Sequence, residues 1–208
     1  MRSPLRLSLL AVALAALAAC GRSVPPVPGD APPAASSSDF SVYELDSRWR
    51  DQEARDRDLG SLSGKARVVA MVYTRCAHTC PLIVSEMKHL EAALPAAERE
   101  RVGFVLVSLD PARDTPAQLA EFAGSMRLDP ARWTLLTGDG EAVRELAAVL
   151  GIRYRPEAGD RISHSNSYLV LDGAGRIVHR QDGLGEGTGP VLARIRAATA
   201  AARSPRRS

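Results

Sequence analysis

Two short, almost uninterrupted apolar segments constrain the fold more than any other feature of this sequence. Residues 67–73 read RVVAMVY and residues 102–109 read VGFVLVSL. Such runs are typical of strands that are buried on both faces, as in a sheet covered by helices. Helical patterns follow both runs, at residues 81–94 and from Thr115 to about Met126. This alternation predicts an α/β fold around a central sheet.

The remaining segments continue the alternation. Thr115 and Pro116 suit the N-cap and the first position of a helix, and Gly151 suits the end of another helix at residues 141–150. We also expect an N-terminal hairpin, a second hairpin and a closing helix, at residues 42–49 with the following turn, 167–171 with 176–180, and 190–202, respectively. This order predicts a thioredoxin-like sandwich: a central mixed sheet flanked by helices, with an N-terminal β-hairpin.

The first 19 residues are typical of a lipoprotein signal peptide, so they are set apart from the fold. Arg2 and Arg6 precede an apolar stretch at residues 9–19, which is shorter than the about 20 residues of a membrane-spanning helix. The stretch ends in LAACG, which resembles a bacterial lipobox, so we expect lipidation of Cys20. The alternatives are a plain signal peptide with an incidental cysteine and an uncleaved anchor.

Residues 20–38 are expected to form a lipid-anchored, Pro- and Ser-rich linker. They contain five prolines and little that could be buried, and at about 3.1 Å per residue the proline-rich stretch at residues 21–38 reaches up to about 55 Å. A folded domain at residues 39–203 and a basic tail at 204–208 follow. We therefore predict a membrane-anchored lipoprotein of the bacterial cell envelope that faces the periplasm.

The composition argues against nucleic-acid binding. Aromatic residues make up 4% of the chain, which is too few for a base-stacking surface. The net charge is +3, and several of the basic residues lie near the two ends of the chain rather than in a central stripe. We expect no nucleic-acid partner.

Two cysteines carry the strongest chemical signal. Cys76 and Cys80 lie in TRCAHTCP, directly after the first buried strand, and Pro81 suits the first position of the next helix. Backbone N–H groups and the dipole at a helix N-terminus favour negative charge, so we expect a lowered pKa for both thiols. Lowered thiol pKa values favour metal ligation and thiol exchange, and in an oxidising compartment the pair could form a disulfide.

The spacing of the cysteines helps to distinguish thiol exchange, metal binding and a structural disulfide. Thiol oxidoreductases of the thioredoxin kind use C-x-x-C, whereas three residues separate Cys76 from Cys80. The longer loop allows two separate metal ligands or a closed disulfide. Soft thiolates select Cu(I), and an imidazole as third donor would complete a three-coordinate site. Zinc, in contrast, generally takes four ligands. A merely stabilising disulfide is the alternative, although so short a loop would gain little from it.

Four motifs in order resemble the Sco/SenC family of copper proteins. They are the C-x-x-x-C-P segment at residues 76–81, SLDPARDTP at 108–116, WTLLTG at 133–138 and ISHS at 162–165. The resemblance extends from about Phe40 to Ala202, which is nearly all of the predicted folded part.

The resemblance implies a copper site formed by Cys76, Cys80 and His164, with Cu(I) as the expected ion and Cu(II) left open. Family members usually have Asp directly before the histidine, where this chain has Ser163. The missing carboxylate could weaken support for the ligand but leaves the three donors intact.

The position of His164 favours it over the other histidines. It is expected in a polar loop at residues 163–167, which in thioredoxin-like folds faces the cysteine loop and usually contains a proline. We expect His78 to be exposed, although it could be an alternative ligand, and His89 and His179 to be structural or solvated. We interpret Asp110, Arg113 and Asp114 as a charged turn beside a helix N-terminus rather than an acid/base pair.

The resemblance further implies a copper chaperone rather than an enzyme. The recipient would be the binuclear copper centre of cytochrome c oxidase subunit II, or another periplasmic copper recipient. The alternative is a thiol-disulfide oxidoreductase that uses Cys76 and Cys80 to reduce the recipient's cysteines. A thioredoxin-like reductant or a copper donor is a further expected partner. A thiol peroxidase is disfavoured because Thr74 lies too close to Cys76.

Overall fold

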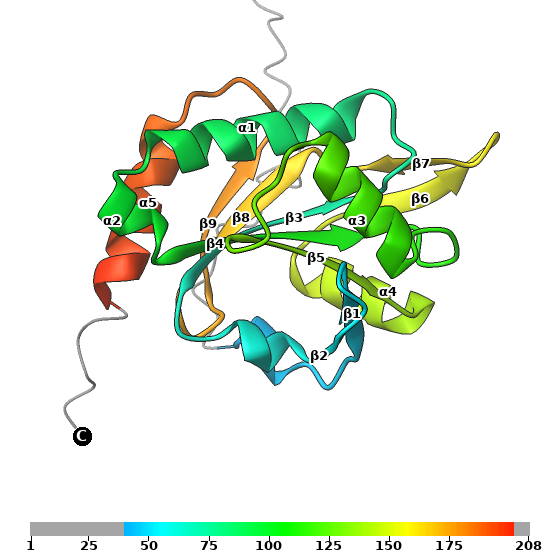
Figure 1. The fold of residues 1–208 in the computed structure, drawn as a ribbon, viewed down its shortest axis with the longest axis horizontal. Coiled ribbons are helices and arrows are strands. Elements are labelled where there is room, and N and C mark those ends of the chain that lie inside the picture. Colours follow the sequence, from blue (N-terminus) through cyan, green and yellow to red (C-terminus); the bar gives the residue numbers. More distant parts are fainter. Residues whose placement is uncertain (1–39, 202–208) are drawn as a thin grey trace, which may run out of the picture. The chain divides into compact units, whose positions relative to one another are not determined.

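A seven-stranded mixed sheet runs through residues 40–201, the part of the chain that the computed structural model describes (Figure 1). The strand order is β2-β1-β5-β4-β3-β8-β9. The strands are β1 (Trp49–Asp51), β2 (Asp56–Arg57), β3 (Ala66–Val72), β4 (Val102–Ser108), β5 (Trp133–Gly138), β8 (Ser167–Leu171) and β9 (Ile177–Asp182). The signal peptide, the linker, the lipidation site Cys20 and the basic tail predicted above lie outside the described residues.

The centre of the sheet explains the two apolar runs. β3, β4 and β5 are parallel, with Val68 opposite Phe104 and Phe104 opposite Trp133. β8 pairs antiparallel with β3. Every residue of β4 is buried, because helices α1 and α5 contact one side of the sheet and α4 covers the other (Figure 1). The predicted mixed sheet flanked by helices is confirmed.

The helices begin where the sequence provides capping residues. Thr115 forms a capping box with Gln118, and Pro116 is the first residue of α3, as predicted. Asp139 caps α4, and Gly151 follows it with a positive φ of 64°, which favours glycine. The helices are α1 (Thr79–Ala93), α2 (Ala96–Arg99), α3 (Pro116–Ser125), α4 (Gly140–Val149) and α5 (Gly189–Ala201).

The N-terminal hairpin is present, but the prediction placed it too early. Val42–Glu44 is a short 3-10 helix, and the hairpin consists of β1 and β2. The Asp51 carboxylate accepts hydrogen bonds from the N–H groups of Glu53 and Arg55 and thereby closes the turn between the two strands. The turn therefore depends on one buried side chain, which the apolar pattern does not reveal.

A second, separate sheet was not predicted. β6 (Tyr154–Glu157) pairs antiparallel with β7 (Arg161–His164), and neither strand joins the main sheet. His164 therefore ends a strand, and its prediction as a loop residue was wrong. The segment is mostly exposed and contains Pro156 and Gly159, so it lacks the apolar alternation of a half-buried strand.

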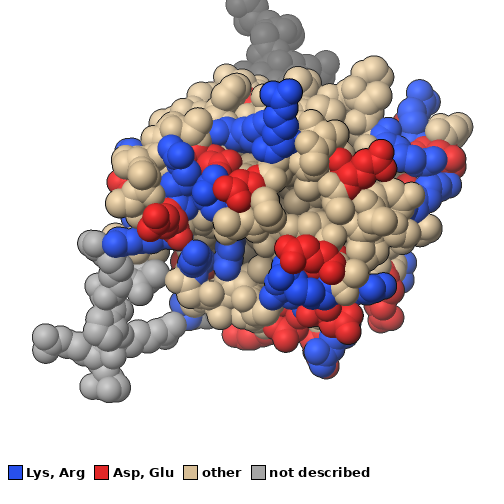
Figure 2. All heavy atoms as spheres, in the orientation of Figure 1, with Lys and Arg blue, Asp and Glu red and all other residues tan. Residues whose placement is uncertain are grey.

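The surface is chemically mixed. Basic and acidic side chains are interspersed over the face shown in Figure 2, and many form ion pairs, such as Arg132 with Glu91 and Asp129. Within residues 40–201, no helix combines the length and the apolar character that crossing a membrane requires.

Candidate metal centre

The loop between β3 and α1 positions both cysteines. The N–H of Cys76 donates to the Tyr73 carbonyl at 3.2 Å, which turns the chain at the end of β3. Cys80 lies in the first turn of α1 and is fully buried, whereas Cys76 is half-buried. The N–H of Cys80 points to the Cys76 sulfur at 3.4 Å. The helix start therefore holds one accessible and one enclosed sulfur.

β7 brings the imidazole to the two sulfurs. The distance from His164 Nε2 to Cys80 Sγ is 3.4 Å, and the ligand atoms of Cys76, Cys80 and His164 all lie within 4.8 Å of one another. No other group of three His, Cys, Asp or Glu side chains converges in this way among the residues described. The structure thus brings together the three side chains that the sequence singled out.

These separations suit a three-coordinate soft metal. Metal–sulfur and metal–nitrogen bonds of about 2.0–2.3 Å place two donors of a trigonal ion about 3.5–4 Å apart. The observed distances need only small side-chain movements to reach this geometry. Two thiolates and one imidazole form a donor set that fits Cu(I) better than a hard cation.

His164 is oriented for ligation by its own backbone environment. Its Nδ1 lies 3.0 Å from the Ser165 carbonyl oxygen, which can only accept, so Nδ1 carries the proton and Nε2 presents its lone pair. Burial lowers the pKa of His164, which favours the neutral, ligating form. The Tyr73 ring meets the imidazole edge-on at 6.0 Å. Ser163, which replaces the family's usual Asp, is exposed.

The two thiols differ in acidity, which corrects the expectation that both pKa values are low. Burial acts to raise the pKa of Cys76, but the backbone N–H groups of Cys80 and His78 stabilise its thiolate, and the net pKa is lowered. Burial raises the pKa of Cys80 far above its ordinary value, and the neighbouring Cys76 adds to this rise. The helix N-terminus therefore acidifies only the accessible sulfur.

This asymmetry predicts selective alkylation of the reduced, metal-free protein. At pH 7 iodoacetamide should modify Cys76 at least about tenfold faster than Cys80, because the thiolate reacts and each pKa unit changes its population tenfold. The rate at Cys76 should fall as the pH drops through its lowered pKa. Peptide mapping by mass spectrometry at several times measures both sites, and labelling of Cys80 first would contradict the assignment.

Asp114 holds the cysteine loop in place through hydrogen bonds. It was not assigned a role in the site from the sequence. It is 1% exposed and accepts hydrogen bonds from the Thr74 N–H at 3.1 Å, the Thr74 hydroxyl at 2.6 Å and the Ser108 hydroxyl at 2.6 Å. It therefore fastens the cysteine loop to the end of β4. The charged-turn interpretation holds for Asp110 and Arg113, which pair at 3.2 Å. Asp114 lies beside the N-terminus of α3, as expected, but the interpretation did not foresee that its carboxylate is buried and hydrogen-bonded.

The other histidines lie outside the cluster. His78 and His89 are exposed, as expected, and His179 is partly buried in β9. None of them belongs to the group of converging donors.

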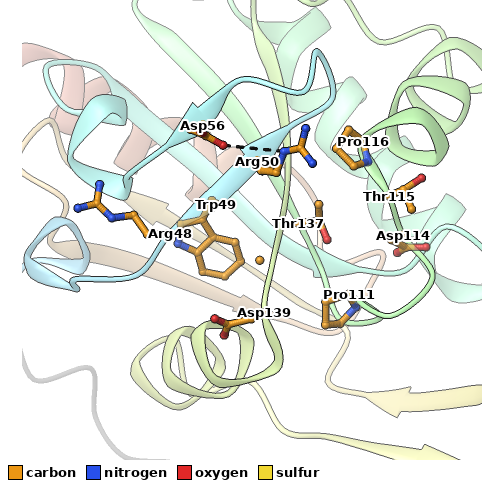
Figure 3. Close-up of a pocket in the computed structure, with 11 residues that line it drawn as sticks. Arg48, Trp49, Arg50, Asp56, Pro111, Asp114, Thr115, Pro116, Thr137 and Asp139 are labelled. Carbon is orange, nitrogen blue, oxygen red and sulfur yellow. Dashed lines mark ion pairs between the residues drawn. The ribbon is translucent and has the colours of Figure 1, made fainter.

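Two cavities border this region, and only one contains a metal donor. A cavity of about 340 Å³ is lined by His164 together with residues 153–155, 163 and 165. A larger hollow of about 670 Å³ lies between the N-terminal hairpin and the starts of α3 and α4 (Figure 3). It includes Asp114, Thr115 and Thr137 but neither cysteine nor histidine. The converging donors therefore lie beside the smaller cavity, not in the larger hollow.

The sheet order and the three donors define a thioredoxin-like domain with a soft-metal site. The SCO1/SenC family model matches residues 39–200. The chain belongs to this family, and the resemblance seen in its motifs is confirmed.

Two curated proteins are similar in sequence. A Stutzerimonas stutzeri protein named for copper binding is 34% identical over 125 residues, which are 58% of this chain and 60% of that protein. The chain thus aligns with less than two thirds of that relative's length. The SCO1 protein homolog of Bacillus subtilis is 28% identical over 146 residues, covering 68% of this chain and 75% of the homolog.

Solved structures show the same fold. Bradyrhizobium japonicum ScoI with copper bound has a TM-score of 0.63 and 22% identity, covering 73% of this chain and 96% of that one. BsSco, described with a disulfide switch as a member of the Sco family of cytochrome c oxidase assembly proteins, has a TM-score of 0.65 and 24% identity, covering 74% and 91%. The thioredoxin-like fold predicted from the element order is confirmed.

Proposed function

We propose that this chain is an exported copper carrier that binds one Cu(I) through Cys76, Cys80 and His164. The observation that carries the proposal is the convergence of the three ligand atoms within 4.8 Å. The name of the Stutzerimonas relative mentions copper binding, and the Bradyrhizobium structure has copper bound. In this role copper is cargo, which the protein receives and passes on.

The three ligands have different roles in binding and releasing copper. Cys76 is half-buried and has a lowered pKa, so its thiolate meets the incoming ion first. Cys80 must give up its proton on binding, which makes affinity depend on pH. His164 closes the site from β7 as a neutral donor. A three-coordinate ion leaves room for a donor of the recipient, so ligand exchange begins at the accessible Cys76.

The proposed carrier delivers copper to a recipient protein and is held on a membrane by a lipid anchor. We assign the binuclear copper centre of cytochrome c oxidase subunit II, or another periplasmic copper protein, as the recipient. Membership of the SCO1/SenC family supports this choice, as does the likeness to BsSco, a member of a family of cytochrome c oxidase assembly proteins. Lipidated Cys20 would hold the chain on a bacterial envelope membrane, and residues 20–38 would let the domain at residues 39–203 reach its partner.

The second candidate function is reduction of the recipient's cysteines. The lowered pKa of Cys76 favours this role. Its thiolate would attack a recipient disulfide, release one recipient thiolate and form a mixed disulfide. Cys80 would then displace the second recipient thiolate, leaving Cys76–Cys80 oxidised. A thioredoxin-like reductant would supply the two electrons for the next cycle.

Titration with Cu(I) tests the carrier function. The reduced full chain should take up one tight equivalent under anaerobic competition with a Cu(I) chelator. The same chain with Cys76 and Cys80 oxidised to a disulfide should lose tight binding, because a disulfide removes both thiolates. A reduced chain that never competes with the chelator would end the carrier proposal and leave thiol exchange as the function.

A further inference from the structure

The metal-ligating imidazole is delivered by an element that the main sheet does not hold. β6 and β7 pair only with each other, over four residue pairs. An isolated two-stranded hairpin is marginally stable in water at best. The hairpin projects from the domain where β3 and β4 end (Figure 1). The position of His164 therefore depends on what fastens this hairpin to the body.

Few contacts fasten it. Tyr154 and Ile162 pack partly buried against the core, and the Ile162 N–H donates to the Tyr73 hydroxyl at 3.3 Å. At the base of the hairpin, the Ser165 N–H donates to the Arg153 carbonyl at 2.9 Å. These contacts lie along the strands and at the base, and none of them involves the turn at residues 158–160.

Asp160 provides an attachment at the tip. Its two carboxylate oxygens contact two arginines from different loops: Arg113 Nη2 at 2.6 Å and Arg75 Nη2 at 3.3 Å. Arg75 directly precedes Cys76, and Arg113 directly precedes Asp114. Asp110, whose side chain is 6% exposed, also pairs with Arg113, through Nη1, and holds that guanidinium in place. One carboxylate thus joins the histidine hairpin to both loops that build the cysteine site.

We propose that Asp160 is a positioning residue that clamps the β6–β7 hairpin closed and so holds His164 against the cysteines. This inference rests on the proposed Cu(I) site. It adds to that proposal the residue that fixes the position of the third ligand, His164, before the metal binds. The clamp acts through the hairpin and touches no ligand atom itself.

The size of the effect follows from solvent exposure. The Asp160, Arg75 and Arg113 side chains are 57%, 46% and 42% exposed, so each single pair is weak. Exposed pairs contribute measurably when several charges form a network with good geometry, as here with one carboxylate shared by two arginines. We expect loss of the clamp to favour hairpin opening by about threefold to tenfold.

Asp160→Asn is the cleanest variant. Asp160 has a positive φ of 60°, a conformation that asparagine tolerates well, so the substitution removes the charge and preserves the turn. Glu157→Gln is the matched control: it removes the same charge from the same hairpin, where Glu157 has only a 3.6 Å pair with the exposed Arg155.

Hydrogen exchange of the reduced, metal-free full chain reports the clamp directly. In Asp160→Asn the amides of residues 154–164 should exchange about threefold to tenfold faster, with unchanged exchange in β3 and β4. Glu157→Gln should match the wild type. Arg75→Gln should also speed up amide exchange in the hairpin. In the double variant with Asp160→Asn, the increase in exchange rate should be smaller than the product of the increases in the two single variants. High salt should narrow the difference between Asp160→Asn and the wild type.

Cu(I) competition on the same proteins separates this inference from the function on which it rests. The affinity of Asp160→Asn should fall by no more than the factor seen in exchange, because its three ligands are intact and only the closed fraction changes. Faster exchange in a chain that binds no Cu(I) would support the clamp and overturn the function. Unchanged exchange in Asp160→Asn, with tight Cu(I) binding by the wild type, would overturn the clamp alone.

Discussion

Replacing His164 with alanine should lower Cu(I) affinity by at least about a hundredfold while thiol exchange at Cys76 continues. Changes to groups that merely support a ligand cost about 10–100-fold, so loss of a direct donor should cost more. The hairpin should remain formed, because its backbone pairing, the Ile162–Tyr73 hydrogen bond and the pairs of Asp160 with two arginines do not involve the imidazole. Competition with a Cu(I) chelator measures affinity, and reaction with a model disulfide measures exchange.

The same experiment separates the two candidate functions. His89→Ala is the control, since His89 is an exposed histidine on α1 outside the donor cluster, and it should behave as the wild type. Equal loss of copper affinity in both variants would deny His164 a specific role. Unchanged affinity in His164→Ala would show that the imidazole is not a ligand.

Asp114→Ala should destabilise the reduced protein by about 3–5 kcal/mol. The substitution leaves three donors without their acceptor: the Thr74 N–H, the Thr74 hydroxyl and the Ser108 hydroxyl. Each buried donor left unpaired costs about 1–3 kcal/mol. Because Thr74 lies two residues before Cys76, the cysteine loop should loosen as well. Urea unfolding followed by circular dichroism measures the free energy of unfolding.

Two further variants sharpen this result. Asp46→Ala removes an acid that is 99% exposed and should change stability by no more than about 0.5 kcal/mol. Asp114→Asn keeps one acceptor oxygen but turns an amide N–H toward the donors, so its stability should lie between those of the wild type and Asp114→Ala. A loss below about 1 kcal/mol in Asp114→Ala would contradict the structural role assigned to this carboxylate.

The sequence predicted those parts of the fold that local patterns determine. β3 and β4 follow from almost uninterrupted apolar runs, and α3 follows from Thr115 and Pro116. The N-terminal hairpin was misplaced because its turn depends on the Asp51 carboxylate. β6 and β7 were missed because they are polar, short and paired only with each other.

The candidate site divides in the same way. Cys76 and Cys80 are recognisable from their spacing at a strand–helix junction, whereas His164 lies 84 residues beyond Cys80 and required the family resemblance. The raised pKa of Cys80 comes from burial by the surrounding fold, which the motif does not encode. The contact between Asp114 and Thr74 spans 40 residues, so no local pattern could indicate it.

X-ray absorption at the copper edge tests the central claim most directly. The reduced full chain, loaded anaerobically with one equivalent of Cu(I), should show two sulfur donors and one nitrogen donor per copper. A spectrum with two sulfurs and no nitrogen would contradict the Cys76–Cys80–His164 centre, as would one that requires sulfur from a second chain.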